Sequence, residues 1–146
     1  FCGVGTFSYP LAQKPGNRVL AVDASKELLE GFKNSVNRQM IANIEIVCRN
    51  LFKYPLEGAE LEGLAAVVFD PPRAGAKEQA ARLAALPAGK RPRKLIAVSC
   101  NPETFARDAE ILQNGGYRLC EVTPVDQFVY TSHCELVALF VDEGLL

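Results

Sequence analysis

The sequence predicts an α/β fold built on a doubly wound, mostly parallel sheet with an antiparallel strand near its C-terminal end. Short apolar runs alternate along the chain with segments of helical periodicity, which is typical of successive β-α units. The last two apolar runs are joined by only about ten residues. Because such a link is too short for a helical crossover, we expect these two strands to pair antiparallel.

The individual elements follow from this alternation. Ser25 is placed to cap a helix whose apolar residues recur at helical spacing, and Pro102 suits the first turn of a later helix. The first of these helices is expected to bury one face, made of Leu28, Leu29, Phe32, Val36 and Met40. Helical segments are predicted at 7–12, 77–86 and 103–113. Strands are predicted at 18–23, 44–48, 64–69, 94–99, 117–124 and 134–141.

Composition limits the class of protein. The 146 residues are 49% hydrophobic and 23% charged, with a net charge of -1, which fits one globular domain spanning 1–146 and argues against a surface that is basic throughout. The five cysteines are odd in number and form no C-x-x-C, so we expect neither a disulfide framework nor a metal site. Reduced thiols favour a cytoplasmic location, and no apolar run is long enough for a membrane span. Because the chain starts with Phe-Cys-Gly-Val-Gly and not with Met, we expect a C-terminal fragment of a longer chain.

Candidate functional residues follow the predicted strands. Asp23, Asp70 and Cys100 each lie at the carboxyl end of a parallel strand, which is where open α/β sheets bind ligands. Glu135 lies at the start of the reversed strand. Since that strand begins where the others finish, we expect Glu135 at the same edge of the sheet.

The Gly3-Val-Gly5 turn and Asp23 together indicate a nucleoside site. A carboxylate 18 residues beyond Gly5, at the end of the next strand, can accept both ribose hydroxyls. The third glycine of a dinucleotide motif is missing, so an adenosyl group without phosphates, such as that of S-adenosylmethionine (SAM), fits better than a pyrophosphate. The alternative is an ordinary turn that leads into a helix.

Three further features have both a functional and a structural interpretation. Asp70-Pro71-Pro72-Arg73 is either a rigid pocket wall with a ligand-binding acid or a solvated turn. The basic run at 90–94 is either a phosphate contact at the rim of the site or a solvated loop. Cys100 precedes a helix N-terminus that would favour its thiolate, although strand-end cysteines are commonly inert and buried.

Glu135 and His133 allow similar alternatives. Glu135 is either a general base beside the pocket or a structural acid, and His133 is interpreted as structural. The other cysteines, Cys2, Cys48, Cys120 and Cys134, are interpreted as inert buried thiols.

In combination these motifs resemble the catalytic domain of the RNA (uracil-5-)methyltransferases, the family that forms 5-methyluridine in RNA. The resemblance covers essentially the whole chain. It rests on Phe1-Cys-Gly-Val-Gly5, Asp23, Asn50-Leu51, Phe69-Asp-Pro-Pro-Arg-Ala-Gly75, Ser99-Cys-Asn-Pro102, Asp126-Gln-Phe128, Thr131, His133 and Glu135. Thr6 departs from the Asn that the family often has there, and Val129-Tyr130 stands where a Pro is common.

The resemblance implies a Rossmann-like class I SAM-dependent methyltransferase fold, of which the first strand and the N-terminal domains are missing here. In many members those domains include an RNA-binding barrel and iron–sulfur cysteines. The resemblance implies Cys100 as the nucleophile and Glu135 as the base. The cofactor-binding residues that it implies are Phe1, Gly3, Gly5, Thr6, Asp23, Asn50 and Asp70.

The activity implied is methyl transfer from SAM to C5 of a uridine in tRNA or rRNA through a covalent adduct between Cys100 and C6. RNA is the expected partner, and no membrane or protein partner is implied. The alternatives are an amino-group or cytosine-5 methyltransferase and a non-catalytic nucleoside-binding scaffold.

Overall fold

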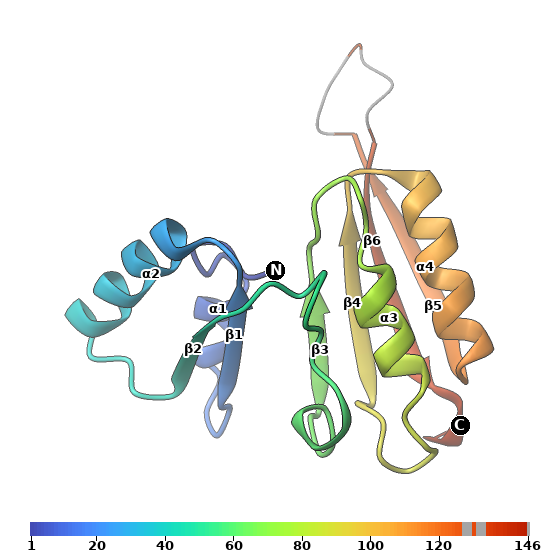
Figure 1. The fold of residues 1–146 in the computed structure, drawn as a ribbon, viewed down its shortest axis with the longest axis horizontal. Coiled ribbons are helices and arrows are strands. Elements are labelled where there is room, and N and C mark those ends of the chain that lie inside the picture. Colours follow the sequence, from blue (N-terminus) through green and yellow to red (C-terminus); the bar gives the residue numbers. More distant parts are fainter. Residues whose placement is uncertain (127–129, 131–133, 146) are drawn as a thin grey trace. The chain divides into compact units, whose positions relative to one another are not determined.

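The computed structural model describes residues 1–126, 130 and 134–145. The chain divides into two compact units, Phe1–Tyr54 and Pro55–Leu146. Figure 1 labels their helices and strands. No helix within the described ranges is long and apolar enough to cross a membrane.

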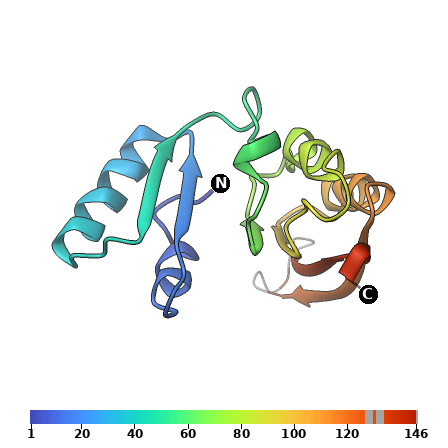
Figure 2. The ribbon, with the colours of Figure 1, turned by 90° about the horizontal axis from the view of Figure 1, so that it is seen from below.

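The first unit contains α1 (Ser8–Ala12), β1 (Val19–Asp23), α2 (Lys26–Arg38) and β2 (Ile44–Cys48). Strands β1 and β2 pair in parallel from Val19↔Ile44 to Asp23↔Cys48. Helix α2 lies along one side of this pair (Figure 2). Its buried residues form a core with Ala21, against which Tyr9 of α1 and the isoleucines of β2 also pack.

The predicted buried face of α2 is confirmed at its centre and wrong at its ends. The side chain of Ser25 caps the helix as expected, because its hydroxyl accepts the Leu28 N–H at 3.3 Å. Leu28 itself is 42% exposed and Met40 is 88% exposed. Met40 is exposed because α2 ends at Arg38 and Met40 adopts a left-handed conformation with φ of 52°. Helical periodicity therefore stops two residues before the last member of the predicted face.

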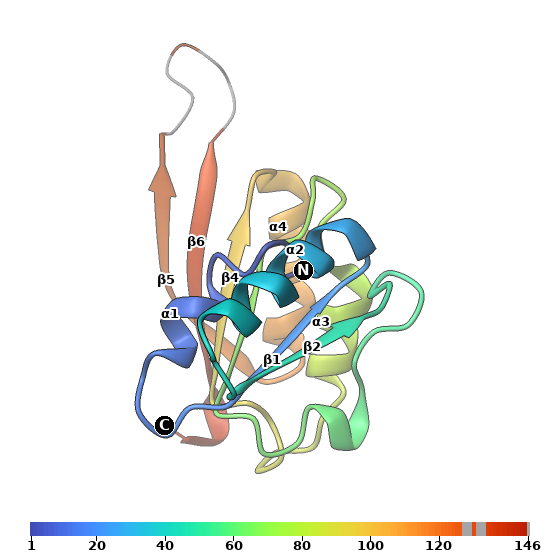
Figure 3. The same cartoon turned by 90° about the vertical axis from the view of Figure 1, so that its left-hand side faces the viewer.

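The second unit contains a four-stranded sheet in the order β3-β4-β6-β5. Strands β3 (Ala66–Phe69) and β4 (Lys94–Ser99) are parallel, whereas β6 (Glu135–Asp142) is antiparallel to both β4 and β5 (Tyr117–Val125). Figure 3 shows β5 and β6 running side by side in opposite directions. The predicted reversal at the C-terminal end is therefore confirmed. Within the described residues, hydrogen bonds join β1 to β2 in the first unit and β3, β4, β6 and β5 in the second.

Two helices cover one face of the four-stranded sheet, α3 (Lys77–Ala84) and α4 (Pro102–Asn114) (Figures 1 and 2). Two short 3-10 helices, η1 (Gly58–Glu60) and η2 (Glu143–Leu145), complete the unit. The core under the helices is apolar and closely packed, since its largest side chains are less than 2% exposed: Tyr117, Phe140, Leu61, Leu83, Leu95 and Leu112. This core fixes α4 against the sheet and, with it, the segment that joins β4 to α4.

Candidate active site

In the first unit the glycine turn contacts the acid at the end of β1. The Gly3 N–H donates to Asp23 Oδ2 at 2.9 Å, and the Ser25 N–H donates to Asp23 Oδ1 at 2.9 Å. Partial burial raises the pKa of Asp23, but the N–H groups of Ser25 and Gly3, together with the positive charge of the N-terminus, outweigh it, so the pKa lies below its usual value. Asp23 is therefore a fixed carboxylate at neutral pH.

The two glycines of this turn have different surroundings. Gly5 is buried with φ of 91°, and a Cβ placed there would lie 2.3 Å from Cε2 of Phe32. Gly3 has φ of 52° with nothing within 4 Å of its Cβ position. Gly5 therefore packs the turn onto α2, whereas the space beside Gly3 is open to a ligand. Thr6 follows on the exposed side of the turn.

Phe1 and Asn50 lie next to the same strand ends. The main-chain nitrogen of Phe1 donates to the Val22 carbonyl at 2.7 Å, which places Phe1 beside the end of β1. Asn50 follows the last pair of the β1–β2 ladder, and its side-chain oxygen accepts the Phe52 N–H at 3.0 Å. The rings of Phe1 and Phe52 contact each other with centroids 5.3 Å apart. Phe52 was not singled out in the sequence, because an aromatic residue in a loop gives no pattern of its own.

The second unit brings Asp70, Cys100 and Glu135 to one edge of its sheet. Asp70 directly follows β3 and is exposed, and partial desolvation raises its pKa. Cys100 directly follows β4, which is parallel to β3, and Glu135 is the first residue of the antiparallel β6. The expectation that these three residues share an edge is therefore met within this unit.

The register of β4 and β6 brings Cys100 and Glu135 to the same end of this strand pair. The last paired residues of the ladder are Ser99 and Leu136, and Cys100 directly follows Ser99 while Glu135 directly precedes Leu136. Both side chains are partly exposed, so neither is sealed in the core.

The backbone around Cys100 is fixed on both sides. The hydroxyl of Ser99, a residue only 5% exposed, donates to the Asn101 carbonyl at 3.1 Å and accepts the Asn101 N–H at 3.2 Å. The side chain of Asn101 then caps α4 by accepting the Glu103 N–H at 3.0 Å. Cys100 therefore sits in a tight turn just before a helix N-terminus, as the sequence predicts.

The remaining cysteines differ in exposure. Burial raises the pKa of Cys2 to about 11, which fits an inert thiol. Cys134 is partly buried, and its thiol donates to the Glu135 carbonyl at 3.3 Å. Cys48 and Cys120 are exposed, so the interpretation of both as buried is wrong. Cys48 ends β2 beyond the core, and Cys120 lies at a register shift on the edge strand β5.

The basic run at 90–94 does not reach the site edge. Lys90 pairs with Glu62 at 3.2 Å, and Arg91 pairs with the buried Asp142 at 3.3 Å. Lys94 starts β4, so it lies about 20 Å from Cys100 along the strand. Phosphate contact at the rim of the site is therefore wrong for this run. His133, Gln127, Phe128, Val129 and Thr131 lie outside the described residues.

Sequence reasoning also missed a polar group on α4. Thr104, Arg107 and Asp108 occur at i, i+3 and i+4 on one helix face and contact the turn that follows Asp70. The i, i+3, i+4 spacing of these polar residues in the sequence indicates that they share one helix face, but it does not indicate what that face contacts.

Comparisons with known proteins agree on one family. A family model described as tRNA (uracil-5-)-methyltransferase matches residues 1–142. An uncharacterized RNA methyltransferase of Brucella suis is 47% identical over 140 residues, which cover 95% of this chain and 32% of that protein. A 23S rRNA (uracil(1939)-C(5))-methyltransferase, RlmD, of Acinetobacter baylyi is 37% identical over 143 residues, covering 96% of this chain and 30% of that protein. The chain thus spans about a third of the length of these curated relatives.

Solved structures share the fold. A SAM-dependent methyltransferase from Aquifex aeolicus superposes with a TM-score of 0.65 at 19% identity, covering 95% of this chain and 78% of that one. TYW2 of M. jannaschii, solved in complex with AdoMet, superposes with a TM-score of 0.68 at 13% identity, covering 97% and 66%. The chain therefore has the Rossmann-like fold of SAM-dependent methyltransferases, as predicted.

Proposed function

This chain belongs to the tRNA (uracil-5-)-methyltransferase family, and from that premise we propose that it is the catalytic domain of an enzyme that methylates C5 of a uridine in tRNA or rRNA with SAM as donor. The observation that carries the proposal is the β4–β6 register, which brings a thiol and a carboxylate to the same end of one strand pair. RNA is the proposed partner, because the similar proteins of Brucella suis and Acinetobacter baylyi are named RNA methyltransferases.

The first unit has residues that fit SAM. The Asp23 carboxylate is ionised and accepts one backbone N–H on each oxygen, which leaves further lone pairs for the ribose hydroxyls. The open space beside Gly3 lets a ligand approach the backbone. We assign Phe1, Gly3, Asp23 and Asn50 to cofactor binding, with Gly5 and Thr6 shaping the turn. The assignment of Asp70 to cofactor binding rests on the family alone. When bound, SAM supplies an electrophilic methyl group.

Cys100 and Glu135 supply the groups that uracil chemistry requires. Uracil C5 is a weak nucleophile, and addition of the Cys100 thiolate to C6 forms a C6–S bond and shifts negative charge onto C5 and O4. C5 thereby becomes able to accept a methyl group. The Glu135 carboxylate then takes the proton from C5, the C5=C6 double bond forms again, and the C6–S bond breaks to release the thiolate. The uridine must leave its stack to reach both side chains.

The test uses the full-length enzyme, SAM with a labelled methyl group, and bulk RNA from cells that lack the gene. Cys100→Ala should lower methyl transfer by at least about 1,000-fold and abolish any adduct, because the attacking group is gone. Glu135→Gln should leave methylated RNA attached to the protein on a denaturing gel, because the proton on C5 then blocks elimination.

Cys120→Ala is the matched control, because this thiol is exposed and lies on β5, away from Cys100 and Glu135. It should keep full activity and form no trapped adduct. Unchanged methylation in Cys100→Ala would contradict the covalent route and favour an amino-group methyltransferase. Absence of a trapped adduct in Glu135→Gln would contradict the role of Glu135.

A further inference from the structure

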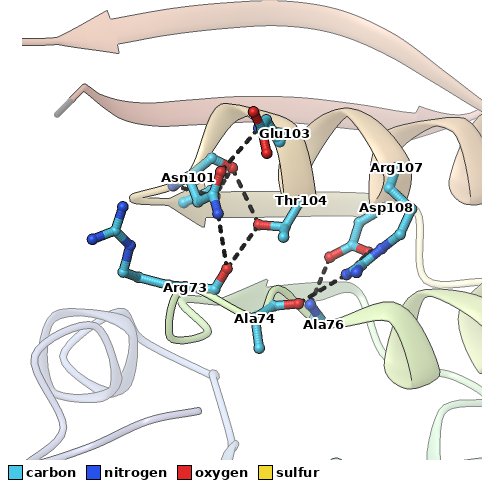
Figure 4. A network of polar contacts seen from close by, with 9 residues as sticks. Arg73, Ala74, Ala76, Asn101, Glu103, Thr104, Arg107 and Asp108 are labelled. Carbon is cyan, nitrogen blue, oxygen red and sulfur yellow. Dashed lines mark hydrogen bonds and ion pairs between the residues drawn. The ribbon is translucent and has the colours of Figure 1, made fainter. Parts of the chain in front are cut away.

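One face of α4 holds the turn between β3 and α3. Figure 4 shows Asn101, Thr104, Arg107 and Asp108 pointing from the start of α4 toward the backbone of this turn. Asn101 Nδ2 and Thr104 Oγ1 donate to the Arg73 carbonyl at 3.2 and 3.1 Å. The side chain of Arg73 points away from these contacts, so the helix binds the backbone of the turn and not its charged group.

The next residues of the turn are held in the same way. Arg107 Nη2 donates to the Ala74 carbonyl at 3.0 Å, and Asp108 Oδ2 accepts the Ala76 N–H at 2.6 Å. Asp108 is only 5% exposed, and Arg107 pairs with its other oxygen at 2.7 Å. Each oxygen of the buried Asp108 carboxylate therefore has a partner, the Ala76 N–H on one and Arg107 on the other. A buried polar group satisfied in this way fixes the geometry of its neighbours.

The absence of a side chain at Gly75 lets Arg107 and Asp108 approach the backbone of the turn closely. Its φ is 76°, and a Cβ there would lie 2.6 Å from both Arg107 Nη2 and Asp108 Oδ2. Its N–H donates to the Pro72 carbonyl at 2.8 Å, which closes the turn on itself. The turn is therefore constrained by its own hydrogen bond and by three side chains of α4.

This network links the two segments that carry candidate site residues. Asp70 begins the turn, and Cys100 is separated from the first residue of α4 only by Asn101, the N-cap. We propose that Thr104 and Asp108 are positioning residues, which hold the turn at 70–76 in a fixed place relative to Cys100 through their contacts with Arg73 and Ala76. The inference rests on the proposed function, since it assigns the geometry in which Asp70 and Cys100 meet their ligands.

Thr104→Val in the full-length enzyme removes one hydroxyl and keeps the shape of the side chain. We expect kcat to fall about tenfold, because displacements of about 1 Å in a reacting site cost up to about 100-fold. The KM for SAM should rise by about threefold or more, because the displaced turn begins with Asp70, a proposed cofactor-binding residue. Thr104→Ser restores the donor and should restore kcat. Asp108→Asn, which keeps an acceptor for the Ala76 N–H but loses the charge that faces Arg107, should also lower kcat.

Glu110→Gln is the matched control, because Glu110 is exposed on the same helix. It should leave kcat, KM and the melting temperature unchanged. If the wild-type enzyme methylates RNA and Thr104→Val keeps its kcat within about twofold, the positioning role is overturned while the proposed function stands. A parallel loss of kcat and melting temperature that Thr104→Ser does not reverse would also overturn it. A wild-type enzyme without methyl transfer would overturn the proposed function and this assignment together.

Discussion

At the scale of single residues, two aspartates at equivalent strand ends have opposite electrostatic surroundings. Asp23 is the last residue of β1, and backbone N–H groups donate to its carboxylate, so its pKa is lowered despite partial burial. Asp70 follows β3 into a turn whose Gly75 N–H goes to the Pro72 carbonyl and whose Ala76 N–H goes to Asp108. Partial desolvation therefore raises the pKa of Asp70. The sequence placed both acids correctly but gave no means to tell them apart, because the direction of backbone N–H groups depends on the turn.

Asp23→Asn tests this difference through the pH dependence of stability. The pKa of Asp23 is lower in the folded protein than in the unfolded chain, so its stabilising effect is complete at neutral pH and is lost as the pH falls below about 4. Since the group is partly solvent-screened, we expect Asp23→Asn to cost only about 0.5–1 kcal/mol at pH 7. In urea unfolding, the difference in free energy of unfolding between wild type and Asp23→Asn should become smaller as the pH is lowered toward 3. For the control Glu30→Gln, at an exposed position of α2, the difference from wild type should not depend on pH in this way. A pH-independent difference for Asp23→Asn would contradict a lowered pKa of Asp23.

At the scale of elements, the glycine turn depends on α2 for its shape. Gly5→Ala must adopt φ of 91° and overlap the ring of Phe32, which is 1% exposed and cannot move aside. We expect a loss of about 3 kcal/mol or more in the free energy of unfolding. Gly16→Ala is the matched control, since Gly16 has φ of 82° in open space and should cost about 1 kcal/mol. Equal losses in thermal unfolding would show that contact with Phe32 does not shape the turn.

Element boundaries and faces were predictable where periodicity alone decides them. The centre of α2 was predicted correctly because Leu29, Phe32 and Val36 face the strands, whereas Met40 was not because the helix had already ended. The polar face of α4 was missed for a different reason. Periodicity identifies the apolar side of a helix, but the partner of Thr104 and Asp108 is a turn about 30 residues earlier, which only the packing of α3 and α4 reveals.

At the scale of the whole molecule, strand direction could be predicted but strand register could not. The short link before β6 required an antiparallel pair and so brought Glu135 to the edge that carries Cys100. That Glu135 directly precedes the residue paired with Ser99 depends on the register of β4 and β6, which a shift of one residue would change. Direction also explains why, of the two interpretations of the basic run, phosphate contact at the site is the wrong one. Lys94 begins the strand that Cys100 follows, so charge clustered in the sequence lies at the opposite end of the sheet.

The two ends of the four-stranded sheet should therefore respond differently to mutation. At the end away from Cys100, Arg91 pairs with Asp142, whose side chain is 3% exposed, and Arg91 also lies 6.0 Å from the ring centroid of Tyr117. Asp142→Ala leaves this mostly buried cation without its partner and should cost about 3 kcal/mol. Because Cys100 and Glu135 lie at the other end of the strands, kcat of the full-length enzyme at 25 °C should change by less than about twofold. Lys90→Ala removes the exposed pair with Glu62 and should change stability by no more than about 0.5 kcal/mol. Thermal unfolding and methyl-transfer rates on the same samples separate the two effects, and a large fall in kcat with Asp142→Ala would contradict this division of the sheet.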